Sequence, residues 1–99
     1  MPDPRMTRQT FTLLLILSRQ SEASGADLAR ESGFKSGTLY PILLRLEAAG
    51  WLASRWEEGE PASLGRPRRR YYRITAIGQH HMASERATME GLFGQVAMT

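Results

Sequence analysis

A run of arginines around a single proline is the strongest chemical signal in the sequence. Arg66, Arg68, Arg69 and Arg70 follow one another with only Pro67 between them, and no acidic residue interrupts the run. Guanidinium groups stay charged at neutral pH and bind phosphate oxygens through paired hydrogen bonds. We therefore expect these side chains to contact the phosphates or the minor groove of duplex DNA, although such a charge run can also be simply solvated.

A second polar group precedes it, on one side of a predicted helix over residues 36–49. We expect Thr38, Tyr40 and Arg45 to reach bases in a major groove, because they lie opposite the apolar side of that helix. Lys35 and Ser36 stand at the helix N-terminus, which favours an anion, so they are expected to meet phosphate. The alternatives are that Tyr40 packs at the edge of the helix and that Arg45 is only a solvated charge on the helix surface.

Catalytic, cofactor-binding and metal-binding patterns are missing from the sequence. There is no cysteine, and the adjacent His80 and His81 would diverge by about 100° on a helix. No nucleophile, base and orienting group stand together, and no glycine-rich phosphate motif occurs. Trp51 and Trp56 could form an aromatic ligand cage, but core or dimer contacts are the commoner role in so small a domain. We expect a protein that is not an enzyme and needs no cofactor or metal.

The elements that must position these groups follow from the apolar spacing. Helices are expected over residues 7–20, 25–32 and 36–49, then strands at 51–56 and 70–75, and last a helix from 76 to about 96. Ser24 with Asp27 forms an expected N-cap of the second helix, which Gly33 ends. Ser36 and Thr75 are expected to cap the third and the last helix.

Two helices joined by a tight turn and followed by a hairpin indicate a winged helix-turn-helix. The fold class is therefore mainly α with a two-stranded β-hairpin, and the Gly- and Pro-rich loop over residues 57–69 is its wing. We expect residues 1–75 to form the winged-helix domain and residues 76–99 a C-terminal dimerisation helix of the same compact unit.

The apolar side of the last helix predicts a homodimer. Together with the widely apolar first helix it is expected to form an interface between two copies, although it could instead pack on its own domain. The expected dimerisation residues are Phe11, Met82, Met89, Leu92, Phe93 and Val96. Two copies would place their recognition helices about 34 Å apart, on a pseudo-palindromic duplex.

The distribution of charge and the lengths of the apolar runs limit the kinds of partner that we expect. Basic residues outnumber acidic ones between Lys35 and Thr75, whereas the two balance before that segment. The longest apolar run, Leu13 to Leu17, is too short to cross a bilayer and follows a polar start. We expect a cytoplasmic protein that does not engage a membrane.

The segment from Ser36 to Gly78 resembles the PadR family of winged-helix transcriptional regulators, in the small subfamily with a short C-terminal helix. The resemblance covers most of the chain when the first helix is included. Its residues are Ser36, Gly37, Thr38, Leu39, Tyr40, Arg45, Leu46, Glu47 and Gly50 in the helix, then Gly65, Arg66, Pro67, Arg68, Tyr72, Thr75 and Gly78. It implies a dimeric repressor, and it leaves open a small-molecule effector of unknown identity.

Leu44 departs from the family pattern, since related sequences usually carry a polar or basic residue there. The outward leucine could touch a thymine methyl or a partner instead. The chain also ends soon after one helix, so we do not expect effector binding by an extended C-terminal domain.

We therefore expect a sequence-specific, duplex-DNA-binding transcriptional regulator, with residues 36–49 in the major groove and the wing on the backbone or minor groove. The competing hypothesis is a winged-helix protein-interaction module without specific DNA binding. Salt separates the two, because DNA binding through many cationic contacts weakens steeply as salt rises and an apolar interface does not.

Overall fold

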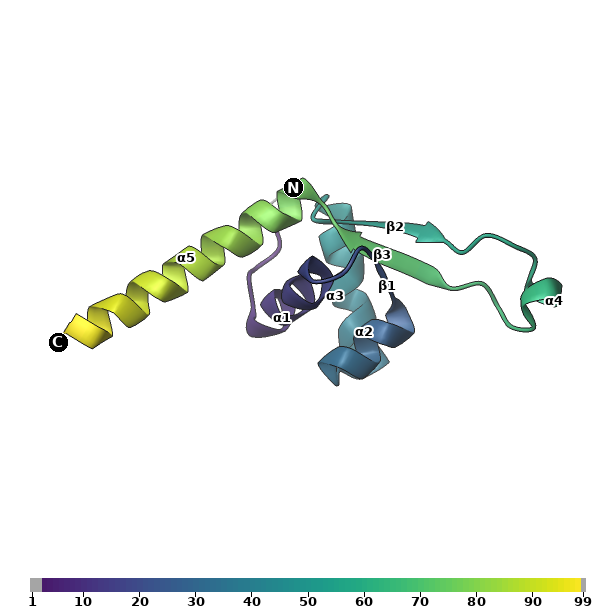
Figure 1. Ribbon diagram of the computed structural model, residues 1–99, viewed down its shortest axis with the longest axis horizontal. Helices are drawn as coiled ribbons and strands as arrows, with labels where there is room; N and C mark the ends of the chain where they lie inside the picture. Colours follow the sequence, from purple (N-terminus) through teal and green to yellow (C-terminus); the bar gives the residue numbers. More distant parts are fainter. Residues whose placement is uncertain (1–2, 99) are drawn as a thin grey trace.

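The computed structural model describes residues 3–98, and the side chains of residues 3–95. In chain order the elements are α1 (Arg8–Ser18), β1 (Ala23–Ser24), α2 (Gly25–Ser32), α3 (Ser36–Ala48), β2 (Leu52–Trp56), α4 (Pro61–Leu64), β3 (Arg70–Ile74) and α5 (Ala76–Met98). Three helices pack on one side of a small sheet, while the wing and α5 extend away in opposite directions (Figure 1). The predicted winged helix-turn-helix is confirmed.

Leucines from the first three helices form the core. Leu13, Leu14 and Leu17 of α1 are fully buried. Each fully buried leucine stabilises the fold by about 1.5–3 kcal/mol relative to an exposed one. The other core members are Ala23, Leu28, Leu39, Ile42, Leu43, Leu46, Trp51, Leu52, Tyr72 and Met82. This core fixes α3 so that its opposite side faces outward.

The ends of α2 are set by the residues that the sequence indicated. The Ser24 hydroxyl accepts a hydrogen bond from the Asp27 backbone N–H at 3.1 Å, and the Asp27 carboxylate accepts one from the Ser24 N–H at 3.2 Å. Gly33 then ends the helix in the left-handed conformation, with φ of 75°. The expected cap of α3 is wrong, because Lys35 holds the N-cap position without a side-chain hydrogen bond and Ser36 is already helical.

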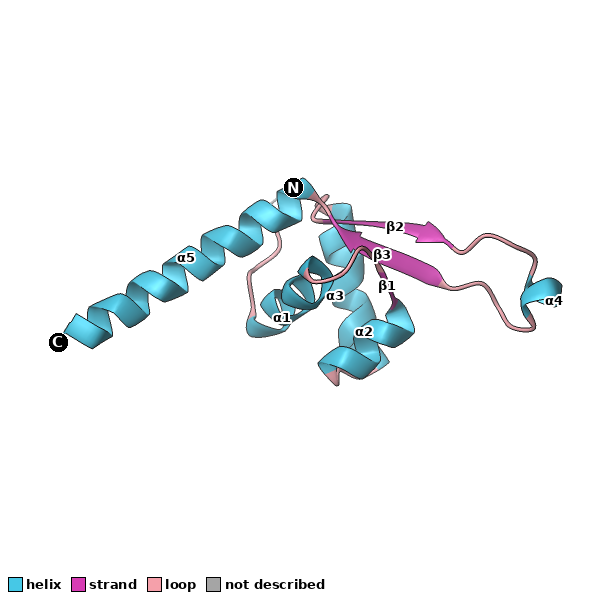
Figure 2. Ribbon diagram, viewed as in Figure 1, coloured by secondary structure: helices cyan, strands magenta, loops and turns pink. Residues whose placement is uncertain are grey.

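The sheet has three strands in the order β1-β3-β2, all antiparallel, so the prediction of a two-stranded hairpin is incomplete (Figure 2). Strand β2 pairs with β3 from Leu52↔Ile74 onward, as expected of the hairpin. The added strand pairs Ala23 with Tyr72. A strand of two residues is too short to show the alternation of apolar and polar residues that predicts a strand. It forms because the segment that enters α2 lies beside β3.

The wing, predicted as loop, contains one helical turn. Pro61 begins α4, where its lacking N–H costs no hydrogen bond, and Gly65 ends it with φ of 72°. At the neck of the wing the Glu57 N–H donates to the Arg69 carbonyl at 2.8 Å, which extends the pairing of β2 and β3 by one step.

Helix α5 is fixed at its beginning and projects away from the core toward its C-terminus (Figure 1). The Thr75 hydroxyl accepts from the Gly78 N–H at 3.1 Å, which confirms the predicted cap, and lies 2.6 Å from the Gly50 carbonyl oxygen. His81 stacks on Trp51 with 4.1 Å between ring centroids. Within the part of the chain that the structure describes, no helix has both the length and the apolar character needed to cross a membrane.

Candidate nucleic-acid interface

The exposed side of α3 carries the residues expected to read DNA. Leu39, Ile42, Leu43 and Leu46 are buried, so the residues between them turn outward. Arg45 is exposed, Tyr40 is 47% exposed and Thr38 is half-buried. Pro41 lies within α3, and the helix continues past it to Ala48.

Tyr40 combines the two roles that the sequence left open. Its ring lies against the first residue of α2, since a Cβ added at Gly25 would stand 2.5 Å from the Tyr40 hydroxyl oxygen. Nearly half of the side chain nonetheless stays in solvent. Tyr40 therefore packs at the helix edge and still exposes part of its side chain to solvent.

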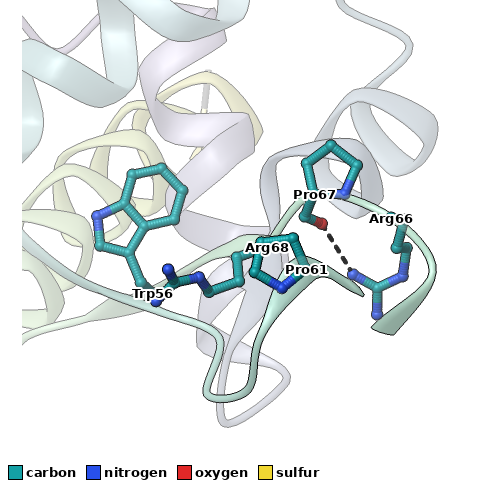
Figure 3. Close-up of a pocket in the computed structure, with 5 residues that line it drawn as sticks. All are labelled: Trp56, Pro61, Arg66, Pro67 and Arg68. Carbon is teal, nitrogen blue, oxygen red and sulfur yellow. Dashed lines mark hydrogen bonds between the residues drawn. The ribbon is translucent and has the colours of Figure 1, made fainter. Parts of the chain in front are cut away.

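Arg66 is tied to an acidic residue in space, although none interrupts the arginine run in the sequence. Its guanidinium donates to both Glu57 carboxylate oxygens, at 2.7 and 3.0 Å. It also donates to the Pro67 carbonyl at 3.2 Å, as Figure 3 shows. This pairing lowers the pKa of Glu57 to about 2, with the Arg69 N–H and the Tyr71 hydroxyl as further donors. The charge of Arg66 is thus largely balanced within the wing.

Arg70 is also engaged, whereas the two arginines before it are not. Arg70 lies 3.4 Å from a Glu47 carboxylate oxygen and 4.9 Å from the centre of the Trp56 ring. Arg68 and Arg69 are exposed and form no salt bridge with any residue that the structure describes. They are the wing cations available to an outside anion.

One cleft joins the wing to the helix-turn-helix. It measures about 320 Å³ and lies between the start of α2, the exposed edge of α3 and the two strands of the wing. Its lining residues are Ser24, Gly25, Ala26, Tyr40, Trp56, Arg68, Arg69, Arg70 and Tyr72. The structure therefore brings Tyr40 together with Arg68–Arg70, which the sequence could not place relative to one another.

A more open depression of about 750 Å³ lies on the wing itself, lined by Trp56, Pro61, Arg66, Pro67 and Arg68. Arg68 extends toward Trp56 there (Figure 3). Trp56 is 57% exposed, unlike the buried Trp51, so only Trp51 takes the expected core role.

Sequence reasoning missed Arg5. It lines a cleft of about 260 Å³ together with Arg45, between the segment before α1 and the exposed edge of α3. Its charge was hidden because acidic residues balance the basic ones in that part of the chain. The sequence indicated a role for Arg5 only through its position just before the first helix.

The expected dimerisation residues divide into two groups. Met82 is buried in the core of its own chain, and Phe11 is half-buried against that core. Leu92 and Phe93 are 58% and 73% exposed on the projecting part of α5. Met89 is half-buried, and the side chain of Val96 lies outside the part that the structure describes. Among the described residues, no group of three His, Asp or Glu side chains could hold a metal ion.

Comparison with known proteins gives a family match. The family model described as "Transcriptional regulator PadR-like family" matches residues 13–84. Comparison with curated proteins gives no match.

Several solved structures are similar to this one. A PadR family transcriptional regulator from Eggerthella lenta DSM 2243 is 32% identical, with a TM-score of 0.67 over 86% of this chain and 77% of that one. A protein from Streptococcus mutans UA159 is 31% identical, with a TM-score of 0.69 over 85% of this chain and 77% of its own. A PadR-like transcription factor from Bacteroides fragilis is 27% identical, with a TM-score of 0.75 over 88% and 84%.

Proposed function

The chain belongs to the PadR-like family of transcriptional regulators, and we propose that it represses transcription as a homodimer bound to a pseudo-palindromic site in duplex DNA. Regulators of this family bind DNA and are not enzymes. The finer assignment is that α3 enters the major groove while the wing follows the backbone or the adjacent minor groove.

The observation that carries this proposal is the shared cleft of Tyr40, Arg68 and Arg69. A recognition helix and a wing can bind one duplex only if their exposed groups open onto the same surface. Here Tyr40 of α3 lines one depression with Arg68 and Arg69, which form no salt bridge among the described residues. The arrangement supports base contacts by α3 together with phosphate contacts by the adjacent wing.

The roles of the individual residues follow from exposure and charge. Thr38, Tyr40 and Arg45 are assigned to base edges, and Lys35 with Ser36 to a phosphate at the N-terminus of α3.

In the wing, Arg68 and Arg69 are assigned to phosphate or minor groove, with Arg70 behind them on Trp56. Arg66 is assigned to holding the wing in shape through Glu57. Arg5 joins the interface beside Arg45.

The exposed apolar side chains of α5 support the dimer. Leu92 and Phe93 lie on a helix that projects past its own core, where a second copy would remove them from water. Two recognition helices related by a twofold axis would meet successive major grooves about 34 Å apart. A dimer seated over a promoter would then repress by excluding the polymerase.

Fluorescence anisotropy at two salt concentrations tests the DNA assignment. The probes are duplex DNA from upstream of the gene and a shuffled duplex of equal composition. We expect tight, salt-sensitive binding to the native duplex, and its loss when Arg68→Ala and Arg69→Ala are combined. Arg19→Ala with Arg86→Ala removes the same charge from exposed sites on α1's end and α5 and should retain binding. Equal, weak binding to both duplexes would instead favour a protein-interaction module.

A further inference from the structure

The outermost stripe of α3 is apolar along its whole length. Gly37, Pro41, Leu44 and Ala48 follow one another at spacings of four, three and four residues, which places them on one line of the helix. All four are exposed, and they lie opposite the buried residues of α3. None has a side chain that donates or accepts a hydrogen bond.

Leu44 is the prominent side chain of this stripe. It is 69% exposed, more than any other aliphatic side chain among the large exposed hydrophobic residues. It is flanked by small residues, and a Cβ added at Gly37 would meet nothing within 4 Å, so no neighbouring segment covers this end of the stripe. A molecule that approaches the exposed face of α3 head-on therefore meets the Leu44 side chain first.

The polar residues of α3 flank the stripe on both sides. Tyr40 lies toward the wing cleft and Arg45 toward Arg5, on opposite edges of the exposed surface. Hydrogen bonds to base edges are thus available only beside the stripe. At its centre, direct readout is limited to apolar contact and to exclusion of polar groups that would be left without partners.

We propose that Leu44, supported by Pro41, reads the methyl group of thymine in the major groove. Thymine presents the one apolar group on that groove, and a leucine facing it buries both, whereas a cytosine amino group at the same place would lose its water without gaining an acceptor. This inference rests on the proposed function and specifies the base that the centre of α3 selects.

The contact has a signature that phosphate contacts lack. Methyl burial releases no counterion, so its contribution is independent of salt. Burial of one methyl-sized group changes an equilibrium constant about fourfold.

The test starts from a duplex selected by the wild-type protein out of a randomised library. Each thymine of that duplex is then replaced singly by deoxyuridine, which removes only the methyl group. We expect one position in each half-site where the replacement weakens wild-type binding about fourfold at both low and high salt. The Leu44→Ala protein should bind the two duplexes equally, because the partner of the methyl group is gone.

Tyr40→Phe is the matched control, since it alters the flank of α3 and leaves the stripe intact. It should weaken binding to both duplexes alike and keep the deoxyuridine penalty. If Leu44→Ala keeps the deoxyuridine penalty as Tyr40→Phe does, the inference is overturned while DNA binding stands. The same holds if no thymine of the duplex is sensitive in the wild type. Failure to select any duplex would instead overturn the proposed function, and this inference with it.

Discussion

Glu57 and Arg66 clamp the neck of the wing through two parallel hydrogen bonds, from Arg66 Nη1 to Glu57 Oε1 at 2.7 Å and from Nη2 to Oε2 at 3.0 Å. The same carboxylate accepts from the Arg69 backbone N–H at 3.3 Å. One acidic residue at the neck thus holds the shape of a loop that also carries the arginine run. It also decides that Arg68 and Arg69, rather than Arg66, are available to a phosphate.

Removal of the Glu57 charge should strengthen non-specific DNA binding. In Glu57→Gln the Arg66 guanidinium is released to meet a phosphate, so the plot of log binding constant against log salt should become steeper by about 0.9. Titration of a shuffled duplex at several salt concentrations measures that slope. Glu58→Gln makes the same charge change at the next position, which is exposed, and should leave the slope unchanged. Equal slopes for the two variants would mean that Arg66 stays away from DNA.

The clamp should weaken in acid within a defined range. Because the pKa of Glu57 is about 2 in the folded protein against an ordinary value of 4.5, the clamp stabilises the wing fully above about pH 4.5. That contribution is lost as the pH falls from 4.5 through about 2. The NMR chemical shift of the Glu57 carboxyl carbon, followed against pH, gives the pKa of Glu57 directly.

Arg66→Ala should return the pKa of Glu57 toward 4.5, since the Arg66 hydrogen bonds are the main cause of the shift. Arg68→Ala serves as the control, because Arg68 makes no hydrogen bond to that carboxylate among the described contacts. A titration near pH 4.5 in the wild type would contradict the clamp.

Gly78 should be intolerant of a methyl group. A Cβ there would collide with the Trp51 carbonyl oxygen and stand 2.8 Å from Ile74 Cγ1, so the start of α5 would have to move off the sheet. We expect Gly78→Ala to lower the free energy of unfolding by about 1–3 kcal/mol, measured by urea denaturation.

Gly91→Ala is the matched substitution in the same helix. An added Cβ at Gly91 meets nothing within 4 Å, so the better helix propensity of alanine should raise stability by about 0.5–1 kcal/mol. The same sign of change at Gly78 and Gly91 would show that α5 does not begin against Trp51.

A charge on the projecting part of α5 should separate the proposed dimer. Phe93 is 73% exposed in the single chain, so Phe93→Lys should leave the fold intact while placing an unpaired charge in the interface. Sedimentation at micromolar concentration should then report a monomer, and binding to a two-half-site duplex should weaken. Gln95→Lys adds the same charge on another side of the helix and should remain dimeric. A wild-type protein that sediments as a monomer would refute the interface itself.

Local features of this chain were readable from the sequence because their causes act over one or two helical turns. Ser24 and Asp27 cap α2 from three residues apart, Gly33 ends it, and Thr75 caps α5. The outward direction of Arg45 followed in the same way from the 3.6-residue period and the buried leucines around it.

Other features depended on which elements meet, and only the tertiary structure decided them. Strand β1 exists because the entry to α2 lies beside β3, and Met82 is buried because α5 begins against Trp51. The arginine run reads as uniform in the sequence, yet Arg66 is balanced by Glu57 while Arg68 opens onto the cleft beside Tyr40. Periodicity and capping are set by near neighbours, whereas ion pairing and burial depend on distances that the chain fixes only after it folds.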